Sequence, residues 1–258
     1  MALHHSQLID HSLHQHTERQ VDQSNQLQYF IHDAESSLNL DGHQVQTMVH
    51  QPSSEQFIAT SFANLGNTIE LDFVQVNEAS AADIRIYSVN NHQGWADTTV
   101  GQVVPDNAGW SVLWKNTSSL STLSDFDANT IIHELGHALG LSHPDGDGAN
   151  SLWSTDHTVM SYNTGSGYKD WFRYTDLEAL VKIWGTEDDH KYTRFARTST
   201  WSSNLLINRG VIGSNIANQY IQANQIQPYE WTEPEGSALI GTGKNEVLRG
   251  LSGWDVIH

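Results

Sequence analysis

The chain has 258 residues, with 30 acidic against 12 basic residues and no cysteine, so its formal net charge is −18. This length allows one large domain or one domain with an appendage. A surface this acidic repels phosphate backbones and argues against nucleic acid as a partner, and no apolar run is long enough for a membrane span. The lack of cysteine excludes disulfide scaffolds, thiolate metal sites and thiol catalysis.

Residues 1–26 are predicted to form an irregular, solvated arm, because they contain too few apolar side chains for a core. The arm carries five histidines, His4, His5, His11, His14 and His16. A histidine-rich tract can also bind metal, but these histidines lack carboxylate or thiol partners at ligand spacing. The segment shows no basic region followed by an apolar one, so export would proceed without an N-terminal signal peptide.

From Leu27 onward the apolar spacing predicts an α+β domain over residues 27–185. Capping boxes at Ser53 and Thr175 predict two helix starts, and Gly66 and Gly185 predict the corresponding helix ends. The expected elements in chain order are a strand over 27–31, a helix over 53–66, half-buried strands around 69–73 and 84–86, short strands over 101–105 and 110–114, and helices over about 125–140 and 175–184. Pro105 indicates that the strand over 101–105 ends there or lies at a sheet edge.

The segment from His133 to His143 reads His-Glu-Leu-Gly-His-Ala-Leu-Gly-Leu-Ser-His. His133 and His137, four residues apart on a helix, project from one face and can bind one zinc ion. Gly140 allows the chain to leave the helix with a positive φ, so that His143 can return as the third ligand. Three neutral imidazoles leave a fourth position open, which is typical of catalytic zinc sites. Glu134 can reach water on the metal without itself binding the metal.

This eleven-residue pattern resembles that of the metzincin zinc endopeptidases. Their second mark, a methionine turn beneath the metal, is similar to the segment from Thr158 through Met160 to Tyr162. Pro144 and the spacing of Met160 and Tyr162 are similar to the serralysin type. The resemblance spans about residues 27–185 and implies a catalytic domain with a twisted, mostly antiparallel-edged sheet and three main helices. It also implies that Tyr162 binds zinc at rest and then donates a hydrogen bond to the reacting carbonyl oxygen.

A nine-residue period begins at Gly241 and resembles the calcium-binding RTX nonapeptide. The resemblance implies the start of a C-terminal β-roll over residues 237–258, with Asp255 as a calcium ligand and residues 186–236 as a β-rich connection. An ordinary glycine-rich hairpin is the alternative. Since stacked repeats usually number at least three, the parent protein is expected to continue beyond His258.

These features predict a secreted zinc metalloendopeptidase that cleaves internal peptide bonds of proteins, with zinc activating the water and Glu134 as general base. Zn²⁺, and Ca²⁺ in the full-length protein, are the expected cofactors, and an inhibitor protein or a propeptide is a further expected partner. An extended substrate would add as a strand to the edge at residues 101–104. Two alternatives stay open. Glu134 argues against a non-catalytic module of a calcium-dependent adhesin or other large RTX protein, and His143 argues against a thermolysin-like hydrolase.

Overall fold

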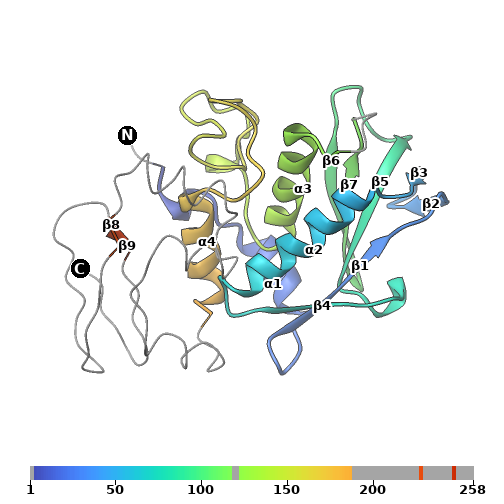
Figure 1. The fold of residues 1–258 in the computed structure, drawn as a ribbon, viewed down its shortest axis with the longest axis horizontal. Coiled ribbons are helices and arrows are strands. Elements are labelled where there is room, and N and C mark those ends of the chain that lie inside the picture. Colours follow the sequence, from blue (N-terminus) through green and yellow to red (C-terminus); the bar gives the residue numbers. More distant parts are fainter. Residues whose placement is uncertain (1–2, 118–121, 188–226, 229–245, 248–258) are drawn as a thin grey trace. The chain divides into compact units, whose positions relative to one another are not determined.

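The computed structural model describes residues 3–117, 122–187, 227–228 and 246–247 (Figure 1). The chain divides into two compact units, Met1–Gly185 and Thr186–His258. In the second unit the described strands are β8 (Gln227–Pro228) and β9 (Glu246–Val247), which pair in parallel. Asp255 and most of the predicted repeats lie outside the described residues, so the calcium site and the β-roll stay predictions.

The first unit has the predicted α+β composition. Its helices and strands in chain order are α1 (His11–Glu18), β1 (Gln26–His32), β2 (Ser37–Leu40), β3 (His43–Met48), α2 (Pro52–Gly66), β4 (Asp72–Gln75), β5 (Ile84–His92), β6 (Gly101–Asp106), β7 (Gly109–Lys115), α3 (Asp125–Ala138) and α4 (Tyr174–Trp184). Short 3₁₀ helices lie at His5–Gln7, Ala79–Ala81 and Pro144–Gly146. None of the helices in the described ranges is long and apolar enough to cross a membrane.

The seven strands of the first unit form one mixed sheet. Strands β4, β1, β5 and β7 run parallel, and β6 pairs antiparallel with β7. The second half of β5 pairs antiparallel with β3, which in turn pairs with β2. Since β6 pairs only with β7 among the described strands, it forms an edge of the sheet, as Pro105 predicted. Among the described strands, the edges β2 and β6 are antiparallel to their neighbours, as the resemblance implied, whereas the edge β4 runs parallel to β1.

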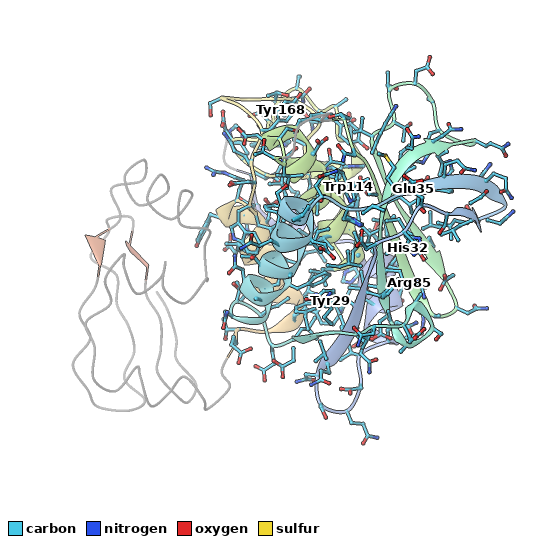
Figure 2. All side chains as sticks on the ribbon, turned by 45° about the vertical axis from the view of Figure 1, so that its right-hand side comes forward. Tyr29, His32, Glu35, Arg85, Trp114 and Tyr168 are labelled. Atoms are coloured by element: carbon cyan, nitrogen blue, oxygen red, sulfur yellow. The ribbon has the colours of Figure 1, made fainter. Side chains whose placement is uncertain are left out.

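Strand β5 is more deeply buried than its sequence predicted. Residues 84–89 are all buried, although Asp83 and Arg85 were expected to alternate with Ile84 and Ile86 in a half-buried strand. Arg85, labelled in Figure 2, donates two hydrogen bonds of 2.9 Å to the carboxylate of Asp106 on β6. At Arg85, β5 lies between β1 and β7, and this ion pair compensates for the burial of the charge. Because both alternating sets of side chains are buried here, the half-buried prediction was wrong.

The predicted strand around 69–73 begins later than expected, at Asp72. Ile69 and Leu71 are nevertheless buried, as their alternation predicted. The strands over 27–31, 101–105 and 110–114 correspond to β1, β6 and β7. Tyr29 of β1 stacks on Phe62 of α2 with ring centroids 4.0 Å apart, so helix α2 and the sheet share one core.

Two helix starts differ from the predicted capping boxes. Helix α2 begins at Pro52 rather than Ser53, and its N-cap is Gln51 without a side-chain cap. Proline suits the first helical position because its missing N–H would have no helical partner there. Helix α4 begins at Tyr174, one residue early, and the backbone N–H of Arg173 donates to Asp176 Oδ2 at 2.8 Å. Gly185 ends α4 with φ = 84°, as predicted.

The prediction of an irregular, solvated arm over residues 1–26 was wrong for the described part of that segment. Helix α1 is capped by Asp10, and both Leu8 and Thr17 have no exposed surface. The hydroxyl of Thr17 donates to the carbonyl of Ala138 at 2.6 Å and accepts from Trp110 Nε1 at 2.8 Å. Composition misled the prediction because this segment is attached largely through hydrogen bonds, which a count of apolar residues does not register.

Candidate metal centre

Helix α3 carries the first two histidines of the predicted site. Ser124 caps it by accepting from the backbone N–H of Asp127 at 3.1 Å, and the helix lies beside β6 and β7 (Figure 1). Nearly every residue of α3 is buried, His133 and Glu134 included. This burial fixes the backbone from which His133 and His137 project, four residues apart on one face.

The three predicted histidines converge on one point. His133 Nε2 lies 3.1 Å from His137 Nε2 and 3.3 Å from His143 Nε2. Ligands at tetrahedral angles with metal–nitrogen bonds of about 2.0–2.1 Å would lie about 3.3–3.4 Å apart. The observed spacing therefore fits three nitrogens around one ion, and these histidines form a group that could hold a metal. No second group of three or more such side chains occurs in the described ranges, and the histidines of residues 3–26 form none.

Backbone carbonyls fix the tautomers of two of these rings. His133 Nδ1 donates to the carbonyl of Val159, and His137 Nδ1 donates to the carbonyl of Leu141, each at 2.8 Å. With the proton on Nδ1, each ring turns its Nε2 lone pair toward the shared point, which is the usual arrangement of a metal-binding histidine. Lone pairs this close repel one another unless a cation lies between them.

Burial also keeps the rings neutral. It lowers the pKa of His133 well below its usual value, with a further contribution from His137, and lowers the pKa of His137 to about 4. Burial likewise lowers the pKa of His143. Neutral imidazole is the form that binds metal, so the fold prepares the three nitrogens for this role.

The chain leaves α3 as the sequence predicted. Gly140 has φ = 102°, a left-handed conformation that glycine adopts without a steric cost. The next residue, Leu141, is fully buried and supplies the carbonyl that orients His137. The third histidine of the group, His143, follows two residues later, before the short helix at Pro144–Gly146.

Met160 lies against α3, as the resemblance implied. Its side chain has no exposed surface, and a Cβ added at Gly136 would meet Met160 Sδ at 2.6 Å. Gly136 lies between the two helical histidines in the sequence, so the methionine packs on the helix next to the metal group. A side chain at position 136 would require this sulfur to move.

A buried carboxylate that the sequence did not reveal holds this turn. Asp176 has no exposed surface and accepts from the hydroxyl of Thr158, from the backbone N–H of Val159 at 2.9 Å and from that of Arg173 at 2.8 Å. Burial raises the pKa of Asp176 to about 6 against the opposing effect of these hydrogen bonds. Asp176 binds the backbone N–H of Val159, and the carbonyl of the same residue orients His133. Through Val159, Asp176 therefore links the start of α4 to the first histidine of the group. Its place at the third position of a helix was the only signal in the sequence.

Glu134 lies between the histidines and strand β6. It is buried, and burial raises the pKa of its carboxyl group to about 8. A Cβ added at Gly101 would meet Glu134 Oε1 at 2.4 Å, so β6 passes directly over the carboxylate. The carboxylate is thereby placed at the sheet edge that the sequence predicted for substrate.

Tyr162 lies on the open side of the group. Its ring centroid is 4.6 Å from that of His143 and 5.6 Å from that of His133, yet 63% of the residue is exposed. Desolvation raises the pKa of its hydroxyl, with a smaller contribution from the charge of Glu134. The structure thus brings Tyr162 to the metal group, and its service as a fourth ligand stays a prediction.

A cavity of about 480 Å³ opens beside Glu134. The residues lining it are Thr98, Thr99, Val100, Gly101, Phe126, Asn129, Thr130, His133, Glu134, Thr155, Ser161, Tyr162 and Tyr168. Glu134 is the only carboxylic acid in this lining, which contains no lysine or arginine. Tyr168, labelled in Figure 2, comes from the chain between the methionine turn and α4. Sequence analysis did not identify Tyr168 as part of this lining, nor Phe126, Asn129 and Thr130, which precede Glu134 on α3.

Comparison with known proteins gives no family assignment. No protein-family model and no curated protein sequence matches the chain. Among solved structures 80 chains match. One, from the GM1-bound form of the ECX AB5 holotoxin, is 14% identical, covers 76% of this chain and 94% of its own, and has a TM-score of 0.41. One structure of myroilysin is 12% identical, covers 69% of this chain and 98% of its own, and has a TM-score of 0.42. Another structure of myroilysin is 13% identical, covers 64% of this chain and 86% of its own, and has a TM-score of 0.37. These similarities are too weak to support a function, which depends on the site itself.

Proposed function

We propose that this protein is a secreted, zinc-dependent endopeptidase of the serralysin-like metzincin type. One observation carries the proposal: three Nε2 atoms converge at ligand spacing beside a buried glutamate, in the wall of a cavity at a sheet edge. A structural metal site would close all four positions with protein ligands, whereas this group supplies three nitrogens. The secreted location rests on the resemblance alone.

Zinc is the metal that this donor set favours. Imidazole nitrogen suits zinc among several transition metals, and zinc accepts tetrahedral coordination without geometric strain. The zinc ion would be held by His133, His137 and His143. The ring of Tyr162 lies beside His143, so its hydroxyl could serve as a fourth ligand. When bound, zinc lowers the pKa of a water ligand and polarises the scissile carbonyl.

Glu134 is the general base of this proposal. Its carboxylate would take a proton from the attacking water and later deliver it to the leaving amine. The cationic metal centre would lower the raised pKa of Glu134 and favour the ionised form that accepts the proton. Tyr162 would donate a hydrogen bond to the carbonyl oxygen as negative charge develops there. Its exposed position leaves the ring room to move.

Strand β6 and the cavity would select the substrate. An extended peptide would pair with the edge of β6 and pass Glu134 at Gly101. The side chain next to the scissile bond would then enter the cavity, which is large enough for an aromatic ring. The neutral residues Phe126, Asn129, Thr130 and Tyr168 in its lining favour large uncharged side chains, because a charged side chain would find no ionic partner among them.

A pair of variants tests this proposal. Glu134→Gln should keep one bound zinc, because Glu134 is not a ligand, and lose about 100-fold or more of the peptide hydrolysis. His143→Ala should lose zinc and hydrolysis together. Metal analysis and casein hydrolysis on the same preparations give both readouts. Loss of zinc from Glu134→Gln, or near-normal turnover by it, would contradict the assignment of the base.

A further inference from the structure

The N-terminal segment contacts the chain that leads to the third histidine. Ile9 and Leu141 form an antiparallel β-bridge. On either side of this bridge, Ser142 N donates to the carbonyl of Leu8 at 2.6 Å and Asp10 N donates to the carbonyl of Gly140 at 2.9 Å. The segment between the last turn of α3 and His143 is therefore one side of a short two-stranded ladder whose other side is residues 8–10.

Two further contacts flank this ladder. At one end, Thr17 Oγ1 donates to the carbonyl of Ala138, the last residue of α3, and is itself held by Trp110 of β7. At the other end, Gln7 Nε2 donates to Asp145 Oδ2 at 2.8 Å, just past His143. Residues 7–17 thus hold the main chain before and after the third histidine.

We propose that residues 7–17 form an intramolecular brace that positions two of the three metal ligands, His137 and His143. The inference rests on the proposed metal centre and concerns residues with no place in its chemistry. The brace acts on His137 through Leu141, whose carbonyl orients the imidazole and whose neighbours pair with residues 8–10. It acts on His143 because that residue directly follows Ser142, which is bonded to Leu8. Gly140, whose left-handed φ makes this segment a sharp turn, has no side chain of its own to anchor it.

Leu8 gives the cleanest perturbation of the brace. Its side chain is fully buried, and Leu8→Ala weakens the attachment of residues 7–17 without touching a ligand. We expect zinc affinity to fall about tenfold, the lower end of the effect of removing a partner that orients metal-binding histidines. Leu27→Ala in β1 is the matched control, because Leu27 is equally buried but lies in the sheet. The control should bind zinc within about twofold of the wild type.

Zinc affinity is measured by competition with a chromogenic chelator on the full chain, and amide hydrogen exchange is measured on the metal-free protein. Without metal, the amide of Ser142 should be protected in the wild type and in Leu27→Ala, and exchange faster in Leu8→Ala. This readout does not depend on the metal: if the wild type binds no zinc, the proposed function fails while the exchange data still test the brace. If Leu8→Ala does not fold, Thr17→Val, which replaces the hydroxyl with a methyl group, should lose about threefold in affinity and speed the same exchange.

Unchanged affinity and exchange in the brace variant would overturn the inference. An equal loss of affinity in Leu27→Ala would also overturn it, because the effect would then reflect general destabilisation.

Discussion

Gly101→Ala tests the contact between strand β6 and the proposed base. Gly101 has no side chain, and a Cβ built there would lie 2.4 Å from Glu134 Oε1 and 2.9 Å from its Cγ and Cδ. Ordinary contact begins at 3.4 Å, so the carboxylate must move by about 1 Å, the difference between 3.4 and 2.4 Å. A misplacement of about 1 Å can cost about 100-fold in rate when it affects reacting groups.

The expected result is a fall of about 100-fold in kcat/KM with zinc still bound at one ion per chain. The assay is hydrolysis of an internally quenched peptide, with metal content measured on the same sample. Gly66→Ala is the matched control: its Cβ would lie 3.3 Å from the carbonyl oxygen of Leu71, far from the cavity, and activity should stay within about twofold. If Gly101→Ala folds, binds zinc and cleaves peptide within about threefold of the wild type, Glu134 does not act from the position described.

Three further predictions concern other parts of the molecule. Tyr162→Phe keeps the ring beside His143 and removes the hydroxyl, so turnover should fall about ten- to a thousandfold with little change in zinc affinity; turnover within about twofold would make Tyr162 a packing residue. Burial lowers the pKa of His50 to about 4, so its neutral form should contribute about 3 kcal/mol of stability above pH 6.5 that is lost as pH falls toward 4. Denaturant unfolding should therefore show a steeper acid loss in the wild type than in His50→Gln, and parallel curves would refute it. Residues 237–258 should bind calcium weakly in this 258-residue chain and tightly once further nine-residue repeats are appended, as measured by calorimetry. Tight binding that Asp255→Ala abolishes in the 258-residue chain would refute this.

The metal group could be predicted from the sequence because its information is local. His133 and His137 are four residues apart on a helix, and Gly140 had to turn the chain. The position of Met160 against Gly136 followed from a family resemblance rather than from physics, because no local rule links two segments so far apart.

The N-terminal segment shows the opposite case. Its composition is polar, and its attachment to α3 depends on single hydrogen bonds such as that from Thr17 to Ala138. Such bonds connect residues more than a hundred positions apart and leave no periodic signal. Strands β2 and β3 were missed for another reason: they are short, much of their surface is exposed, and only two or three side chains in each strand turn inward.

Asp176 could not be recognised either. A carboxylate near a helix start is usually read as a cap, and that reading is correct for its bond to Arg173. Its bonds to Thr158 and Val159 depend on how α4 packs against the methionine turn, which is a tertiary property. The cavity walls likewise come from residues 98–101, 126–134 and 155–168, which only the fold brings together.

The most direct test is X-ray absorption spectroscopy at the zinc edge, together with metal analysis of the purified protein. The three converging imidazoles predict one zinc per chain, bound by three nitrogen ligands at about 2.0–2.1 Å and one or two oxygen ligands. Removal of the zinc by a chelator should abolish peptide hydrolysis, and added zinc should restore it. A protein that hydrolyses peptides without metal, or a bound zinc that lacks three imidazole ligands, would contradict the assignment of this centre.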